Sequence, residues 1–69
     1  MYLLKEEYAE MFKTKYVIKT MANQLHYSQS YLSLIFNRHK SCSIKTAESI
    51  TKYINSDANV EDYFEILVK

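Results

Sequence analysis

The amino-acid sequence predicts an all-α protein, one compact domain of five short helices over residues 1–69. Three observations favour this class. Apolar residues recur at every third or fourth position, which is the spacing of amphipathic helices. The chain contains no Gly and no Pro, which excludes flexible linkers and Gly-rich phosphate loops. Its 69 residues, 48% of them hydrophobic, can enclose only one small core.

The first helix is expected at about residues 3–13. Its apolar stripe consists of Leu4, Tyr8, Met11 and Phe12. The opposite positions hold glutamates, which form a solvated face rather than a carboxylate pair in a cleft. Strands are not expected, because apolar and polar residues do not alternate with the period of two that a half-buried strand requires.

Residues 19–37 predict two helices that cross at a steep angle, with a tight turn at residues 26–28. The second helix is expected at about 17–25 and the third at 29–36. The buried positions of this segment are Met21, Ala22, Leu25, Tyr27, Leu32 and Ile35. Ser28 can accept a hydrogen bond from the free backbone N–H groups that open the third helix. This spacing leaves the third helix with a polar outer face.

The last two helices are predicted at residues 44–54 and 60–68. Ser43 can cap the first of them, and Asn55 can close it in the left-handed conformation that Asn tolerates better than most residues. Its inward residues are Ala47, Ile50, Tyr53 and Ile54. Asn59 can cap the fifth helix. That helix is expected to bury some of its apolar residues, namely Val60, Tyr63, Phe64 and Leu67.

Charge is unevenly distributed along the chain, although the net charge is only +1. Residues 13–52 carry seven Lys and Arg side chains against one Glu, whereas both ends of the chain are acidic. A basic centre between acidic ends would attract a polyanion to the centre. Taken alone, these charges are explained by an ordinary solvated surface. Together with the helix pair at residues 17–37, they favour a surface that binds a polyanion.

The order of five short helices, with a tight turn between the second and third, resembles the lambda repressor and Cro family of XRE-type helix-turn-helix regulators. The resemblance covers residues 17–64, and its helix-turn-helix core lies at about 17–37. Met21 and Ala22 match the family's residues at the closest approach of the two helices. Leu25, Leu32 and Ile35 match its buried positions, and Phe36-Asn37 is similar to the usual end of its recognition helix. The family implies a compact DNA-binding domain whose recognition helix enters the major groove.

Two positions depart from the family pattern. His26 stands where the family usually has Gly, so its backbone must accept a positive φ at a cost of about 1 kcal/mol. His is among the non-Gly residues that adopt this conformation most often. Ile18 stands where many members carry a Gln that anchors the DNA backbone, which leaves Lys19 beside it as the substitute.

The resemblance implies DNA contacts by position. The expected base-contacting residues are Gln29, Ser30, Ser33 and Leu34. The expected phosphate-contacting residues are Lys19, Ser28, Tyr31, Asn37, Arg38, Lys40 and Lys45. Gln pairs with adenine through two hydrogen bonds, and Leu can touch a thymine methyl group. Ser can hydrogen-bond to more than one kind of base and so discriminates little between them. The alternatives are a solvated Gln29, a core position for Tyr31 and ordinary exposed charges at the basic residues.

Catalysis and metal binding are not expected. The soft ligands His26, His39 and Cys42 lack the paired spacings of a structural zinc site, and a Cys42–His39 pair would lack an orienting third group. We therefore predict a non-enzyme without a cofactor or small-molecule ligand. The lone Cys42 fits a reducing cytoplasm, that of a bacterium or a phage-infected cell. No apolar run reaches 18 residues, and the N-terminus does not resemble a signal peptide.

The sequence thus predicts a sequence-specific transcriptional regulator, a Cro or repressor type from a phage or mobile element. A homodimer on a palindromic double-stranded DNA operator is expected, with half-sites about 10 bp apart or a multiple of that. Its expected dimer interface comprises Tyr63, Phe64, Leu67 and Val68. The alternative is a protein-interaction module on the same fold: an antitoxin, an anti-repressor or another phage-type inhibitor. A third reading, the N-terminal domain of a longer repressor, is disfavoured by the ending at Val68-Lys69 without a linker tail.

Overall fold

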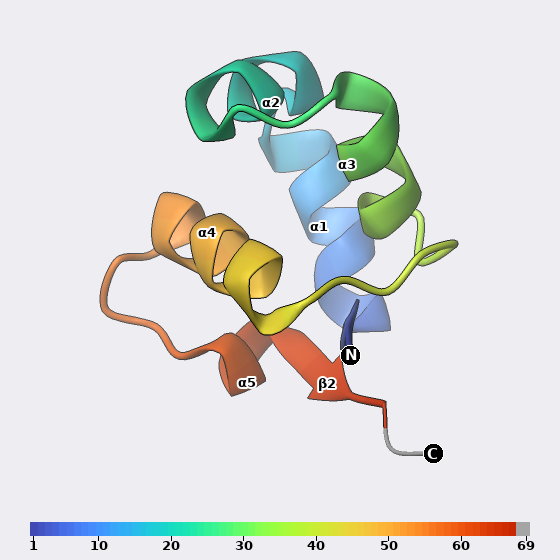
Figure 1. The fold of residues 1–69 in the computed structure, drawn as a ribbon, viewed down its shortest axis with the longest axis vertical. Coiled ribbons are helices and arrows are strands. Elements are labelled where there is room, and N and C mark those ends of the chain that lie inside the picture. Colours follow the sequence, from blue (N-terminus) through green and yellow to red (C-terminus); the bar gives the residue numbers. More distant parts are fainter. Residues whose placement is uncertain (68–69) are drawn as a thin grey trace.

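The computed structural model describes residues 1–67, which form five helices and a two-stranded antiparallel sheet around one core (Figure 1). In chain order the elements are β1 (Tyr2–Leu4), α1 (Glu6–Lys15), α2 (Ile18–Leu25), α3 (Gln29–Phe36), α4 (Ile44–Ile54), α5 (Val60–Tyr63) and β2 (Phe64–Ile66). The predicted helical character is confirmed. Within residues 1–67, no helix is both long enough and apolar enough to cross a membrane.

The sheet corrects the prediction of an all-α chain without strands. β1 pairs antiparallel with β2, with Tyr2 opposite Ile66 and Leu4 opposite Phe64. Each strand has only three residues, too few for a period of two to be recognised, and the partners come from opposite ends of the sequence. Leu4 and Phe64 are both buried, so the pairing places two apolar side chains in the core together.

The sheet also shifts two helix boundaries. The expected first helix began at residue 3, but α1 begins at Glu6 and continues to Lys15. The expected fifth helix ran to residue 68, but α5 ends at Tyr63 because Phe64 is extended (φ −123°) and enters the sheet. Both boundaries moved because backbone pairing across the sheet replaced helical hydrogen bonds that local periodicity had predicted.

Aromatic packing organises the core around Phe12 of α1. Its ring centroid lies 5.5 Å from that of Tyr8, 5.3 Å from that of Tyr63 and 6.3 Å from that of Phe36. The rings of Tyr63 and Phe36 are edge-on to Phe12, whereas the ring of Tyr8 is stacked on it. Both arrangements stabilise aromatic pairs beyond their buried area. The predicted stripe of α1 was wrong at Met11, which is 49% exposed. Ala9, on the other side of Phe12, is buried in its place.

Helix caps follow the sequence at three of the four predicted positions: Ser28, Ser43 and Asn59. The backbone N–H groups of Tyr31 and Thr46 donate to the Oγ atoms of Ser28 (3.1 Å) and Ser43 (3.4 Å), as predicted. Asn55 is extended (φ −154°) rather than left-handed, and its Oδ1 instead accepts from the N–H of Asp57. At the start of α5, the carboxylate of Asp62 accepts from the Asn59 N–H at 2.9 Å.

Candidate nucleic-acid interface

The turn between α2 and α3 adopts the predicted backbone conformation. His26 has φ 63° and ψ 37°, in the left-handed region, which confirms the positive φ expected there. The N–H groups of His26 and Tyr27 both donate to the carbonyl oxygen of Ala22, so the turn folds back on the end of α2. Ser28 then caps α3, so the turn between the two helices spans only residues 26–28.

One face of α3 is buried and the other is open. The inward residues Leu32, Ile35 and Phe36 have no exposed surface. The four expected base-contacting residues line one shallow depression on the opposite face: Gln29, Ser30, Ser33 and Leu34. Three of these four are exposed and Ser33 is half-buried. The face is uncharged and mainly polar, with one apolar side chain, Leu34, which is 45% exposed.

Tyr27 links the turn before α3 to α4, and Tyr31 packs against Tyr27. The hydroxyl of Tyr27 donates to Thr46 Oγ1 at 3.3 Å, and Ser43 Oγ donates to the same oxygen at 3.4 Å. The rings of Tyr27 and Tyr31 lie 5.6 Å apart, and both are half-buried against the core. Tyr31 therefore packs as a core residue, the default alternative for this position.

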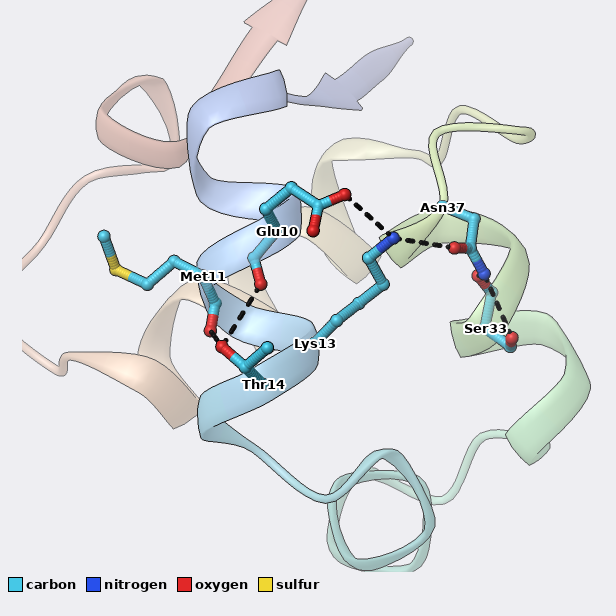
Figure 2. Close-up of polar contacts among 6 residues, drawn as sticks. All are labelled: Glu10, Met11, Lys13, Thr14, Ser33 and Asn37. Atoms are coloured by element: carbon cyan, nitrogen blue, oxygen red, sulfur yellow. Dashed lines mark hydrogen bonds and ion pairs between the residues drawn. The ribbon is translucent and has the colours of Figure 1, made fainter.

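Asn37, at the end of α3, is held by the side chain of Lys13 and by the backbone carbonyl of Ser33. Lys13 Nζ donates to Asn37 Oδ1 at 3.1 Å, and Asn37 Nδ2 donates to the carbonyl oxygen of Ser33 at 2.8 Å (Figure 2). Lys13 also lies 3.4 Å from Glu10 Oε1. This contact joins α1 to α3 and brings Lys13, which was not among the expected contact residues, beside the candidate surface. Residues 24 positions apart give no local sequence signal of such a contact.

Arg38, expected to bind phosphate, faces the sheet instead. Its backbone is left-handed (φ 60°), and its Nε donates to the carbonyl oxygen of Leu4 at 2.9 Å. The guanidinium nitrogens lie 3.9 Å from Glu6 Oε2 and 3.7 Å from Glu65 Oε1. A guanidinium between two carboxylates is a poor phosphate ligand, because its charge is already balanced.

Three other expected phosphate contacts remain available. Lys19 lies in the first turn of α2, Lys45 in the first turn of α4 and Lys40 in the loop after α3; all three are exposed. None has an acidic partner within salt-bridge distance among residues 1–67. Exposed cations near helix N-termini suit phosphate oxygens, since free backbone N–H groups lie beside them.

The expected dimer residues divide between core and surface. Phe64 is 1% exposed, and the Tyr63 ring packs edge-on against Tyr8 at 4.9 Å, so both close the core rather than face a partner. Leu67 is 42% exposed, and Ile66, which was not selected from the sequence, is 53% exposed. Val68 lies outside the described residues.

Cys42 is buried, and its thiol is a poor nucleophile. It is 1% exposed, and burial raises the pKa of its thiol to about 11. A nucleophilic cysteine requires the opposite shift. No group of three His, Cys, Asp or Glu residues within 1–67 is arranged to hold a metal ion.

Comparisons of the chain with protein-family models, with curated proteins and with solved structures give no match. The likeness to the XRE-type regulators therefore depends on the residues quoted above.

Proposed function

We propose that the chain is a sequence-specific double-stranded DNA-binding regulator that acts through a helix-turn-helix formed by α2, residues 26–28 and α3. One observation carries the proposal: the outer face of α3 presents four short or flexible side chains together, while its inner face is fixed in the core. A short helix anchored in this way can enter the major groove without rearranging the fold.

The distribution of charge supports DNA as the ligand. Lys19 lies in the first turn of α2, Lys45 in the first turn of α4 and Lys40 in the loop after α3, and all three are exposed, so they can neutralise phosphates. The acidic side chains Glu6 and Glu65 lie with Arg38 at the sheet, which Figure 1 shows at the end of the molecule opposite α2. This separation of positive and negative charge would direct a polyanion toward α3 and away from the sheet.

In this function, Gln29 provides base preference and the lysines provide affinity that is independent of sequence. A homodimer on an inverted repeat would place one α3 in each half-site. The regulator would act in the cytoplasm by occupying its operator.

The decisive experiment is selection from a random double-stranded DNA pool at two salt concentrations. Wild-type chain should enrich an inverted repeat, with affinity that falls steeply as salt rises. Gln29→Ala should relax preference at one position of each half-site and cost about 1–3 kcal/mol on the best site. The matched control is Gln24→Ala, an exposed Gln on α2 outside the α3 face. An unchanged selected sequence in Gln29→Ala would place base recognition elsewhere.

A protein-interaction module is the second candidate, favoured by the absence of any cation on the outer face of α3 and by the exposure of Leu34. Under this alternative, the selection would enrich no sequence. Leu34→Ser would then abolish binding to a protein partner while leaving weak, sequence-independent DNA binding unchanged.

A further inference from the structure

The side chain of Lys13 connects α1 to the end of α3. Its Nζ donates to Asn37 Oδ1 at 3.1 Å and lies 3.4 Å from Oε1 of Glu10, three residues earlier on α1 (Figure 2). Only 34% of the Lys13 side chain is exposed, against 79% of that of Glu10. The ammonium group is therefore held at the end of α3 by contacts within the protein, whereas the carboxylate beside it is largely in solvent.

Asn37 presents an acceptor, not a donor, on the side of Lys13. Its Nδ2 is occupied by Ser33, donating to the carbonyl oxygen at 2.8 Å and to Oγ at 3.4 Å. Its Oδ1 accepts from Lys13 and cannot bind a phosphate oxygen, since both groups are acceptors. In this arrangement Asn37 holds Lys13 in position, and Lys13 is the group that can donate to an anion.

The Lys13 ammonium has a donor left for a ligand. An ammonium group carries three N–H bonds. One is used by Asn37 and a second faces Glu10, which leaves the third within the part of the chain that the structure describes. The ammonium lies at the C-terminal end of α3, next to the residue that binds Ser33 on the α3 outer face. Phosphates border the groove that a recognition helix enters, so a donor at this end of α3 can meet one.

The charges around Lys13 identify Glu10 as its competitor. Lys13 lines a depression between α1 and the end of α3, whose other titratable lining residues are Glu6, Glu10, Arg38 and His39. Arg38 lies 3.9 Å from Glu6, so these two charges balance each other. The carboxylate of Glu10 remains, and a phosphate would have to replace it beside the ammonium.

We propose that Lys13 binds a backbone phosphate of DNA at the end of α3, and that Glu10 weakens this contact by competing for the same ammonium. The inference rests on the proposed function and adds to it a contact from α1, outside the helix-turn-helix. The exposed Glu10 side chain can swing into solvent when a phosphate arrives, while Asn37 keeps Lys13 in place. Because a phosphate carries no base identity, the contact adds the same affinity to every DNA sequence.

The first test measures affinity for double-stranded DNA of unrelated sequence by fluorescence anisotropy over a salt series. Lys13→Met keeps an apolar stem and removes the charge, so it should reduce the slope of log affinity against log salt by about 0.9. Lys15→Met is the matched control. Lys15 lies in the same last turn of α1, with its Nζ 5.8 Å from the centre of the Tyr16 ring, and its loss should leave the slope unchanged.

The same experiment separates phosphate binding from a purely structural role. A lysine that only links α1 to α3 would alter the free energy of unfolding, measured with urea, and leave the salt slope at its wild-type value. That result would overturn the proposal. A reduced slope in Lys13→Met, with the slope of Lys15→Met intact, would support it whether or not the unfolding free energy also changes.

A double-mutant cycle tests the competition by Glu10. Glu10→Gln should raise affinity for all DNA sequences about two- to fivefold, the size of effect expected for one exposed ion pair. In the Lys13→Met background the same change should have no effect, because there is no ammonium to release. Glu7→Gln removes the same charge from an exposed position on α1 and should raise affinity much less. An equal gain from Glu10→Gln in both backgrounds would show that Glu10 acts by general repulsion, which would overturn the competition.

Failure of this inference and failure of the proposed function give different results. A wild-type chain whose DNA affinity falls steeply with salt, but whose slope is the same in Lys13→Met, refutes only the Lys13 contact. A wild-type chain without salt-dependent affinity for double-stranded DNA refutes the proposed function, and the Lys13 contact with it.

Discussion

The guanidinium of Arg38 donates from Nε to the carbonyl oxygen of Leu4 at 2.9 Å and so fastens the end of α3 to β1. The same group lies between the carboxylates of Glu6 and Glu65, from α1 and β2. One side chain therefore links three elements to the loop that follows the candidate recognition helix. Its left-handed backbone (φ 60°) directs the side chain toward the sheet at some conformational cost.

Arg38→Lys should lower the free energy of unfolding by about 1–2 kcal/mol, because Lys keeps the charge but loses the planar group that binds Leu4 and both carboxylates together. Urea denaturation measures the change. Glu6→Gln is the matched control: its carboxylate is 87% exposed, so its removal should have a much smaller effect. Equal stability of wild type and Arg38→Lys would show that the contact to Leu4 contributes nothing net.

His26→Gly should raise the free energy of unfolding by up to about 1 kcal/mol, since Gly adopts φ 63° without the steric cost that a Cβ imposes. A Gly substitution two residues earlier, at Gln24, provides the contrast. Gln24 is exposed within α2, where Gly should lower stability by about 1 kcal/mol. Thermal or urea unfolding of both variants checks the sign. If His26→Gly were as destabilising as Gln24→Gly, the imidazole would be stabilising the turn.

Local signals in the sequence predicted most of the helical part of the fold. Apolar spacing located α2, α3 and α4 to within a residue, and Ser28 and Ser43 cap helices as their positions predicted. These features depend on neighbours three or four residues away. The positive φ of His26 was predictable for a different reason: the family resemblance marked that position as one that normally requires Gly.

Three features that escaped prediction are long-range contacts. The pairing of Tyr2 with Ile66, the contact from Lys13 to Asn37 and the bond from Arg38 to Leu4 join residues at least 24 positions apart. No periodicity encodes them. The last two contacts matter for the candidate interface. Asn37 and Arg38 were expected to bind phosphate, but both side chains instead bind other groups of the protein. The exposed lysines then remain the main source of phosphate affinity.

Lys40→Ala should weaken binding to the selected operator and to unrelated DNA by the same factor, and reduce the slope of log affinity against log salt by about 1. Lys40 is exposed in the loop after α3 and has no acidic partner among residues 1–67. Fluorescence anisotropy over a salt series measures both quantities. Lys5→Ala, at the sheet, is the control and should leave both unchanged. A selective loss on the operator alone would indicate that Lys40 reads bases.

Cys42 makes the stability of the protein sensitive to alkaline pH. Burial raises the pKa of its thiol from 9.0 to about 11, so the folded state binds the proton more tightly than the unfolded state. The stabilisation is complete below pH 9 and is lost as pH rises through 11, by about 3 kcal/mol in all.

The matched variant is Cys42→Ala, which lacks the thiol but keeps the backbone bonds to Tyr2. It should be less stable than wild type at neutral pH because a buried side chain is shortened. The difference in unfolding free energy between the two proteins should shrink between pH 9 and 11 as the wild-type thiol ionises. Urea denaturation at a series of pH values gives that difference directly. A constant difference across this range would mean that the folded protein accommodates the thiolate, and that the Tyr2–Cys42 bridge is open to water.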